Sequence, residues 1–269
     1  MRVGLLHPGE MGAAVGALLV ERGHEVLWLP RGRSAASARR AREAGLVAAD
    51  RLGEVDAILS ICPPHAALAV ARSLPGGASL VIDANAVSPA SARAIGALLG
   101  PRWVDGGIVG PPPRAPGTTR IYLSGARADE AAPLFEGTAL EAVVLRGSPV
   151  AASTLKMTYA AWTKGTAALL LAIRATARAT GVEEALLTEW ARSQPGLAER
   201  SEGAARSAAT KGWRWTDEMR EIAATLAESG LPAGFHEAAA EIFDRTQAPA
   251  RPSLDGVLEA LAACGGAAA

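Results

Sequence analysis

The first half of the chain alternates short apolar runs with helical patterns, and this alternation limits the folds that the sequence can adopt. The apolar runs are continuous, which is typical of strands covered on both faces. Strands that alternate with helices in this way form βαβ units around a mostly parallel, doubly wound sheet. The predicted strands cover residues 2–6, 25–29, 57–62, 79–83, 103–109, 119–124 and 140–145, and the predicted helices cover 11–22, 34–44, 64–73 and 88–99.

The pattern changes after residue 147 and becomes entirely helical. Ser148 suits the N-cap of a helix and Pro149 its first turn, and no helix breaker follows until Gly181. We predict one long helix over about residues 149–180, roughly 48 Å long. Further helices are predicted at 183–193, 195–209, 216–229, 232–246 and 253–263, before a short tail at 265–269 that we expect to fray. The predicted domains are therefore an α/β domain at residues 1–147 and an all-α domain at residues 148–269.

The composition excludes several classes of protein. The 27 basic residues balance 27 acidic ones, so no charge excess indicates a nucleic-acid-binding surface. Hydrophobic residues make up 49% of the chain, which is enough to build a core. Cys62 and Cys264 have no metal-binding spacing, and the N-terminus has no signal-peptide pattern. The longest apolar run is too short to cross a bilayer. We expect a soluble, cytoplasmic protein without a nucleic-acid or membrane partner.

The first predicted strand leads into a turn that suits a dinucleotide phosphate group. In a GxGxxG turn, the second glycine lets the backbone approach the pyrophosphate and the third lets helix and strand pack closely. Gly9 and Gly12 occupy these places, while His7 replaces the first glycine. An ordinary glycine turn is the alternative, and His7 itself is interpreted as a tolerated turn residue rather than a catalytic one. The position after the first strand favours a Rossmann-like site, whose predicted contacts are Gly9, Glu10, Met11 and Gly12.

The segment after the second predicted strand favours NADP(H) over NAD(H). An NAD site places an acidic residue near the end of this strand, and residues 27–41 contain none. Arg31, Arg33 and Ser34 instead offer guanidinium and hydroxyl groups to a 2′-phosphate. The alternative is that these arginines only solvate a loop. We expect two further arginines of the segment to be surface charges, Arg39 and Arg40.

Several motifs then occur in an order that resembles a known superfamily. After the Gly-x-Met-Gly turn come Cys62-Pro63-Pro64, Asp83-Ala84-Asn85-Ala86-Val87-Ser88-Pro89, Asp105-Gly106-Gly107-Ile108-Val109-Gly110 and Ser153-Thr154-Leu155-Lys156. Together they resemble the β-hydroxyacid dehydrogenase and 6-phosphogluconate dehydrogenase superfamily of NADP-binding proteins. The resemblance covers the chain roughly to Gly181. The remainder resembles a little-characterised branch with a C-terminal helical domain of unassigned function, through Lys164-Gly165, Trp213-Arg214-Trp215 and Gly234-Phe235.

The resemblance implies a role for particular residues. A lysine on the long helix is the catalytic acid/base of the superfamily, and Lys156 holds its place. The segment after residue 83 touches nicotinamide and substrate, which implies such contacts for Asn85, Ala86 and Ser88. The loop that lines the substrate pocket corresponds to Gly107, Val109 and Gly110, and Cys62 and Pro63 border the cofactor.

The chain departs from the superfamily pattern in three places, and the changes at Ala160 and at Asp217-Glu218 put the familiar hydroxyacid substrates in doubt. The first phosphate-loop glycine is His7, and Ala160 replaces an asparagine one turn after the lysine. A Lys-Asp pair of the C-terminal domain is replaced by Asp217-Glu218. Since Thr216 suits an N-cap, these two acids read most simply as partners of a helix dipole.

The chain contains only three lysines, Lys156, Lys164 and Lys211, and only one asparagine, Asn85. Lysine can transfer a proton during hydride transfer when burial lowers its pKa, whereas arginine stays protonated. Tyr159 shares a helix face with Lys156, so it either orients the substrate or relays a proton, or it packs with its hydroxyl at the surface. A structural role is favoured for Lys164.

We therefore predict an NADP(H)-dependent oxidoreductase of the β-hydroxyacid dehydrogenase type, acting on a small polar hydroxy or keto compound. An NADPH-dependent imine reductase and a non-catalytic NADP-binding regulator are the alternatives. The histidines suggest no metal site. A homodimer is expected, because the helical domain is too small to close a pocket alone. Its aromatic residues are interpreted as core or interface residues, namely Trp162, Trp190, Trp213, Trp215 and Phe235.

Overall fold

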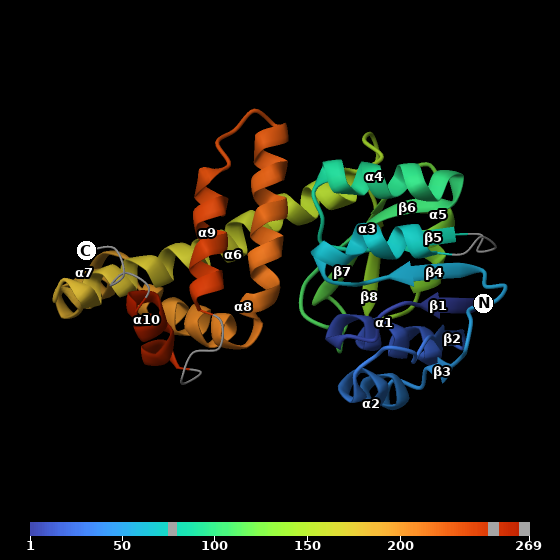
Figure 1. The fold of residues 1–269 in the computed structure, drawn as a ribbon, viewed down its shortest axis with the longest axis horizontal. Helices are drawn as coiled ribbons and strands as arrows, with labels where there is room; N and C mark the ends of the chain where they lie inside the picture. The colour runs from blue at the N-terminus through green and yellow to red at the C-terminus, as the bar shows by residue number, and fades with distance from the viewer. Residues whose placement is uncertain (75–79, 247–252, 264–269) are drawn as a thin grey trace. The chain divides into compact units, whose positions relative to one another are not determined.

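The structure, a computed structural model, describes residues 1–74, 80–246 and 253–263 (Figure 1). It forms two compact units, Met1–Met157 and Thr158–Ala269, and each is considered by itself. Cys264 and the tail at 265–269 lie outside the described residues. Within the described ranges, no helix is long and apolar enough to cross a membrane.

The first unit is built around one eight-stranded sheet, which confirms the predicted doubly wound, mostly parallel α/β fold. The strand order is β3-β2-β1-β4-β5-β6-β7-β8, and only the β6–β7 pair is antiparallel. The two-residue β3 has no counterpart among the predicted strands. The strands are β1 (Arg2–Leu5), β2 (Glu25–Trp28), β3 (Val47–Ala48), β4 (Ala57–Ser60), β5 (Leu80–Asp83), β6 (Trp103–Val109), β7 (Thr119–Ser124) and β8 (Leu140–Val144).

Helices cover both faces of this sheet and bury its apolar side chains. On one face, Val15 and Leu19 pack with Leu5 and Val26 of the strands. On the other face, Ile95 packs with residues such as Ile58 and Val81. The first group of helices comprises α1 (Glu10–Glu21), α2 (Ala35–Glu43) and α5 (Ala128–Ala131), and the second comprises α3 (Pro64–Ser73) and α4 (Pro89–Leu99). Two 3₁₀ turns, η1 (Gly100–Arg102) and η2 (Ala132–Phe135), complete the unit.

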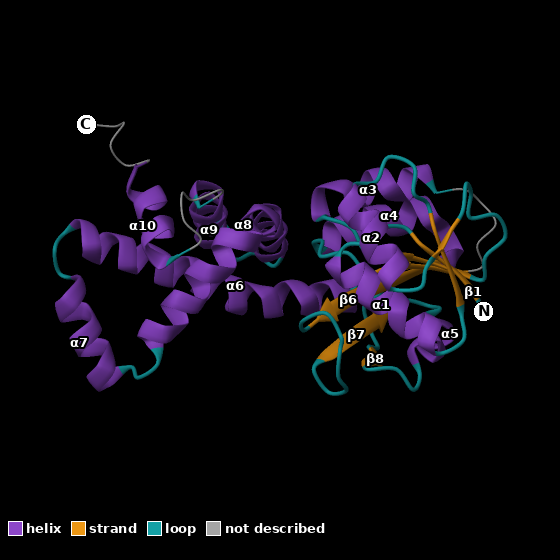
Figure 2. Ribbon diagram, turned by 90° about the horizontal axis from the view of Figure 1, so that it is seen from below, coloured by secondary structure: helices purple, strands orange, loops and turns teal. Residues whose placement is uncertain are grey.

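In its described part, the second unit contains helices and no strand (Figure 2). The predicted long helix is present, although it begins within the first unit, so the boundary between the units falls at Met157 and not at residue 147. The helices are α6 (Ala151–Ala179), α7 (Glu183–Ser193), α8 (Leu197–Glu228), α9 (Gly234–Arg245) and α10 (Leu254–Ala263).

The two helices predicted at 195–209 and 216–229 are wrong, because the chain forms the single helix α8 there. Gly212 is not a breaker. A Cβ at this position would lie 3.2 Å from Thr246 Oγ1, so the glycine lets α9 approach α8 closely. Thr216 is consequently not an N-cap but a buried residue inside the helix, with its Oγ1 3.4 Å from the carbonyl of Gly212.

Candidate functional site

The carboxyl edge of the first unit's sheet is the natural place for a ligand. Strand order reverses between β1 and β4, and in open α/β sheets ligands bind outside the carboxyl ends of the strands at such a reversal. β1, β2, β4, β5 and β6 are parallel neighbours. The loops that follow them therefore meet at this edge, and most of the predicted site residues lie in these loops or at the helix and strand ends beside them.

The turn after β1 has the geometry that its glycines predicted. A Cβ on Gly12 would lie 2.1 Å from the carbonyl oxygen of His7, and one on Gly16 would lie 2.8 Å from Leu46. Both glycines therefore permit close packing of α1. At Gly9, in contrast, a Cβ would have no neighbour within 4 Å. Space thus lies open beside the backbone at the position where a dinucleotide phosphate would approach.

The start of α1 and the nearby charges suit an anion. No side chain caps α1 at Gly9, so the N–H groups of its first turn face outward from the helix end. Burial, helped by the charge of Arg33, lowers the pKa of His7 to about 4. His7 is therefore neutral at pH 7. The charge of Arg33 also acts on Cys62 after β4, so its field reaches both sides of the strand reversal.

The arginine segment after β2 divides into exposed and structural members. Arg31 and Arg33 are exposed, while Ser34 caps α2 by accepting a hydrogen bond from Ser37 N at 3.2 Å. Arg40 is not the surface charge that the sequence suggested. Its Nε donates to the carbonyl of Pro8 at 3.1 Å, so it braces the phosphate turn from α2.

Asn85 lies inside the protein and is held by other residues. Its Oδ1 accepts from Cys62 N at 2.6 Å, and its Nδ2 donates to Ser60 Oγ at 3.1 Å and to a carboxyl oxygen of Asp83. Only 2% of Asn85 is exposed. Its direct contact with substrate or cofactor stays a prediction, and the observed bonds show that it joins the loops after β4 and β5.

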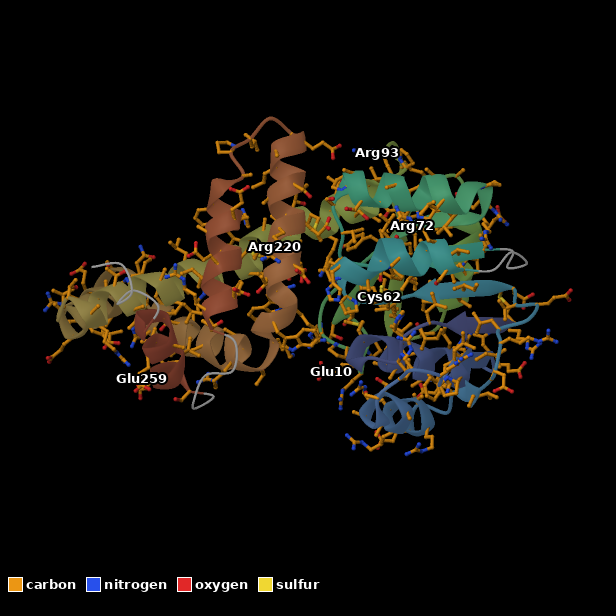
Figure 3. The ribbon with its side chains drawn as sticks, in the orientation of Figure 1. Glu10, Cys62, Arg72, Arg93, Arg220 and Glu259 are labelled. Carbon is orange, nitrogen blue, oxygen red and sulfur yellow. The ribbon has the colours of Figure 1, made fainter. Side chains whose placement is uncertain are left out.

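The other predicted residues of these loops are also largely buried. Burial, and then the charge of Asp83, raise the pKa of the Cys62 thiol to about 12, so this cysteine is a poor nucleophile. Pro63 precedes the first residue of α3 (Figure 3 labels the neighbouring Cys62 and, at the start of α1, Glu10). Ser88 is 2% exposed and caps α4 by accepting from Ser91 N at 3.3 Å.

Lys156 lies at the same edge as the phosphate turn. β5 ends at Asp83, which pairs with Asp105, so the residues of β6 after Asp105 extend beyond the end of β5. One of these is Gly107, where a Cβ would lie 2.6 Å from the carbonyl of Ala152 and 3.0 Å from Lys156 Cβ. The glycine therefore allows the first turns of α6 to rest on β6.

The remaining residues of the predicted pocket surround this contact only in part. Val109 is buried, and Gly110 has a φ of +125° and lies against the backbone of Thr118 and Thr119. Both shape the end of β6. Tyr159 follows one turn after the lysine on α6, within the second unit, and is 49% exposed.

Sequence reasoning missed a buried polar cluster beneath Lys156. Asp105 Oδ1 accepts from Ser153 Oγ at 2.5 Å, and its Oδ2 accepts from Ser153 N at 2.9 Å and from Ser124 Oγ at 2.8 Å. Burial raises the pKa of Asp105, and these hydrogen bonds oppose the rise. The signal that was available was an acidic residue inside an otherwise apolar strand.

The second unit contains a buried ion pair of its own. Lys164 of α6 pairs with Glu218 of α8, with 19% and 8% of the side chains exposed, and the ammonium lies 5.7 Å from the ring centroid of Trp215. The structural role favoured for Lys164 agrees with this geometry. The interpretation of Glu218 as a helix-dipole partner is wrong, since α8 does not begin there. His236 Nε2 lies 3.2 Å from the carbonyl of Ala161.

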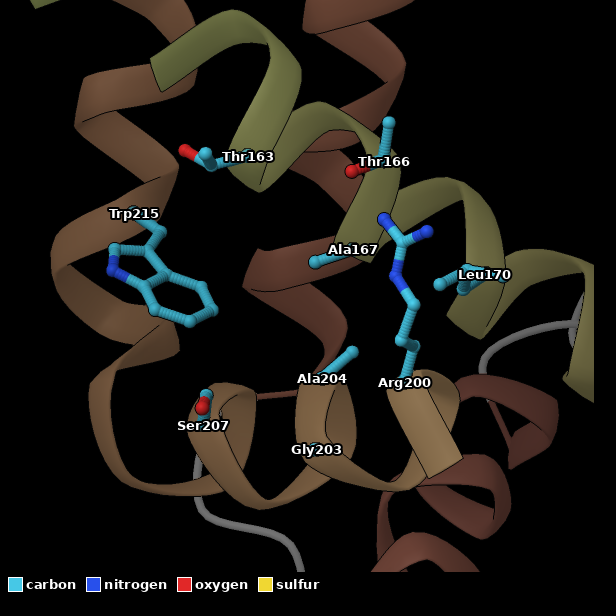
Figure 4. Close-up of a pocket in the computed structure, with 9 residues that line it drawn as sticks. All are labelled: Thr163, Thr166, Ala167, Leu170, Arg200, Gly203, Ala204, Ser207 and Trp215. Carbon is cyan, nitrogen blue, oxygen red and sulfur yellow. The ribbon is translucent and has the colours of Figure 1, made fainter. Parts of the chain in front are cut away.

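A pocket of about 240 Å³ lies between α6 and α8 within the second unit (Figure 4). Trp215 forms one wall, and Arg200 extends from α8 toward α6. None of the residues that were predicted as site residues lines it. The lining consists of Thr163, Thr166, Ala167, Leu170, Arg200, Gly203, Ala204, Ser207 and Trp215. Among the described residues, no group of histidine, cysteine and acidic side chains is arranged to hold a metal.

Comparison with known proteins identifies the class of fold. Residues 177–246 match a domain of unknown function, DUF1932. A solved structure of the conserved protein MTH1747, of unknown function and similar to 3-hydroxyacid dehydrogenases, is 27% identical, with a TM-score of 0.69 over 97% of this chain and 99% of that one. A conserved hypothetical protein from Sinorhizobium meliloti 1021 is 25% identical, with a TM-score of 0.70 over 98% and 96% of the two chains. A search among curated proteins gives no match.

More distant structures share the fold. A 3-hydroxyisobutyrate dehydrogenase from Salmonella typhimurium is 16% identical, with a TM-score of 0.66 over 96% of this chain and 99% of that one. Imine reductase, reductive aminase and prephenate dehydrogenase structures also match. The chain has the fold of the 3-hydroxyacid dehydrogenases, and residues 177–246 of its second unit match the DUF1932 model. The fold that the resemblance of the motifs implies is thereby confirmed.

Proposed function

We propose that the protein is an NADP(H)-dependent oxidoreductase of the β-hydroxyacid dehydrogenase type, acting on a small polar hydroxy or keto compound. One observation carries the proposal above the others. Gly107 brings the first turns of α6, with Lys156, against the carboxyl edge of the sheet where the phosphate turn also lies. Structural neighbours that are dehydrogenases and reductases support an oxidoreductase.

The residues of the phosphate turn fit a nicotinamide dinucleotide. Gly9 leaves open space, Gly12 permits the close turn, and the uncapped α1 N-terminus attracts phosphate. The exposed Arg31 and Arg33 supply charge for a 2′-phosphate. The fold neighbours include a reductive aminase in complex with NADPH and a prephenate dehydrogenase in complex with NAD⁺. A bound nicotinamide would supply or accept the hydride.

Lys156 would move the proton that accompanies this transfer. Its ammonium group would donate to the substrate oxygen as a carbonyl is reduced, and its amine would accept the proton in the reverse direction. Gly107, Val109 and Gly110 would shape the wall beside the substrate. Asn85 would act from inside the protein by holding Cys62 N.

The replacement Lys156→Met tests the proposal, because it keeps the length of the side chain and removes the proton. In a screen of small keto acids, semialdehydes and cyclic imines, turnover of the best substrate should fall about 10²- to 10⁴-fold, while NADPH affinity, followed by nucleotide fluorescence, should stay within about twofold of the native protein. Lys211→Met, an exposed lysine of α8, is the matched control and should retain activity.

Three outcomes would contradict this assignment or part of it. Equal turnover by Lys156→Met and the native chain would remove Lys156 from the chemistry and favour an NADP-binding regulator, which the substitution of His7 for the first glycine also suggests. Equal affinity for NADPH and NADH would remove the 2′-phosphate assignment of the arginines. Preferred reduction of imines would favour the imine reductase alternative, for which the observation is the buried Ala160 in place of asparagine.

We also propose that the protein is a homodimer that associates through its second unit. Four large aromatic side chains of this unit are exposed by about half or more, and such surfaces mark association sites. They lie on three helices, α6, α8 and α9, and are Tyr159 (49%), Trp162 (67%), Trp213 (52%) and Phe235 (52%). These side chains are uncharged, so they suit an apolar surface of the same kind on a second copy of this chain.

A further inference from the structure

The N-terminus of α6 is attached to the sheet by a carboxylate. Asp105 and Ser153 are both almost fully buried, and Asp105 accepts from the hydroxyl and from the backbone N–H of this serine. Ser124 joins the two elements again, since its Oγ donates to Asp105 and accepts from Ala152 N at 3.0 Å. A negative charge at this position also interacts favourably with the dipole of α6.

Lys156 is one helical turn beyond Ser153 and rests on the same strand. Its Cβ faces Gly107, two residues after Asp105 on β6. Two contacts to β6 therefore fix both the height and the rotation of this turn: the hydrogen bonds at Asp105 and the close approach at Gly107. A shift of either contact would move the lysine relative to the carboxyl edge.

Asp83 determines whether the charge on Asp105 can be kept. The two residues are neighbours in the β5–β6 register and both are buried. The groups that face Asp83 are Asp105, Asn85 and Cys62. Asp105 receives hydrogen bonds from Ser153 and Ser124, whereas Asp83 receives its hydrogen bonds from Asn85, and its Oδ2 has no partner within the described part of the chain. Two adjacent buried carboxyls cannot easily ionise together, so the proton belongs on Asp83.

We propose that Asp105 is the positioning residue for Lys156, with its carboxylate holding the first turn of α6 on β6 while the neighbouring Asp83 remains protonated. This inference rests on the proposed function for its kinetic consequence. The position of the Lys156 side chain can be tested without assuming that function. Asp105 itself lies beneath the surface and makes no contact with substrate in this role.

Because the chain has only three lysines, the position of the Lys156 side chain can be followed directly by labelling. Reductive methylation with ¹³C-formaldehyde labels three lysines and the amino terminus, and Lys→Arg variants assign the signals. Ser153→Ala removes one bond to Asp105, and Asp105→Asn removes the charge and turns a donor toward Ser153 or Ser124. We expect the Lys156 methyl signal to move in Ser153→Ala and to move further in Asp105→Asn, while the signal of the exposed Lys211 stays in place.

Ser148→Ala is the matched control, because Ser148 Oγ also accepts a hydrogen bond at the start of α6, from Val150 N at 3.3 Å. It should leave the Lys156 signal unmoved. An unmoved Lys156 signal in folded Ser153→Ala would overturn the proposal, as would an equal shift in Ser148→Ala. If Asp105→Asn fails to fold, Ser153→Ala decides the matter.

Kinetics then separates this inference from the proposed function. Where turnover depends on Lys156, Asp105→Asn or Ser153→Ala should lower kcat on the order of 10- to 100-fold, with the KM for NADPH within about twofold of native. A proportional change in that KM would indicate general loosening and contradict positioning. If Lys156→Met leaves turnover unaltered, the proposed function fails, while the methyl signals still report on Asp105.

Discussion

Asp83 is a buried carboxyl group whose raised pKa makes the stability of the protein depend on pH. Burial, followed by the nearby charge of Asp105, raises the pKa of Asp83 to about 7, although Asn85 opposes the rise through its hydrogen bonds. The ordinary value of 3.8 applies to the unfolded chain. Between these values the folded protein binds more protons than the unfolded chain, so the free energy of unfolding decreases as the pH rises.

Asp83→Asn should remove this pH dependence, because an amide resembles the protonated carboxyl and does not ionise. From about pH 5 to about pH 8, the native protein should lose about 1–3 kcal/mol more of its free energy of unfolding than the variant loses. Urea unfolding at both pH values measures the difference. Asp50→Asn, at an exposed carboxyl, is the control and should follow the native curve. If the free energy of unfolding changed equally with pH in Asp83→Asn and in the native chain, Asp83 would not be the group that binds this proton.

For single residues, the sequence predicted the features that depend on a local motif. It did not predict those that depend on contacts with residues far along the chain. The local geometry at Gly9 and Gly12 was predictable because it depends on a turn of a few residues. The burial of Asn85 was not, because its partners Ser60 and Cys62 come from another strand and loop. Arg40 was misjudged for the same reason, since its acceptor, the carbonyl of Pro8, is 32 residues away.

Helix contacts in the second unit depend on glycines inside helices. A Cβ on Gly165 of α6 would lie 2.9 Å from Nε2 of the buried His236 on α9. At Gly203 of α8, the nearest atom would be Arg206 Nη2 at 4.0 Å. The first glycine is required by a neighbouring helix, and the second is not, although both carry the conformational entropy cost of glycine in a helix.

Alanine at these two positions should therefore have opposite effects. Gly203→Ala should raise the free energy of unfolding by about 0.5–1 kcal/mol, since only helix propensity changes. Gly165→Ala should lower it by about 1 kcal/mol or more, because overpacking against His236 exceeds the gain in propensity. Thermal unfolding of the two variants beside the native chain measures both. If Gly165→Ala raised the free energy of unfolding, the result would contradict this prediction and show that α9 can shift to accommodate the Cβ.

Element boundaries were predicted where apolar period and capping residues agreed. α7 and α3 begin and end at the predicted residues, and α4 ends at the predicted residue 99, with Ser88 as its N-cap. α8 was divided incorrectly over residues 210–215, because the helix there is stabilised by packing in which Gly212 lets α9 approach closely, and such a contact is not visible in a local pattern. β3 has two residues, Val47 and Ala48, which is too few for any periodic pattern.

For the whole molecule, the proposed homodimer is the property that can be tested directly. The predicted dimer rests on exposed aromatics of the second unit, whereas the first unit has far fewer large exposed apolar side chains among its described residues, Leu98 on α4 being one. Trp162 is the most exposed of the aromatics at 67%. A glutamate in its place introduces a charge that is costly to bury in an interface.

The native protein should sediment at twice the chain mass of 27.4 kDa. Trp162→Glu and Trp213→Glu should shift the equilibrium toward the monomer by on the order of 10-fold or more, while Leu98→Glu, which is 47% exposed on α4, should leave it unchanged. Sedimentation velocity over a range of concentrations distinguishes these cases. A native monomer at working concentration would eliminate the proposed dimer.

The boundary between the two units lies within α6, and this disfavours insertions and deletions at that point of the chain. The helix continues from Ala151 to Ala179 without a loop at Met157. One inserted or deleted residue near this point would turn everything beyond it by about 100° and displace it by about 1.5 Å. Loops usually absorb such length changes, but here no loop exists to do so. We expect homologous chains to differ freely in sequence over this stretch while keeping its length.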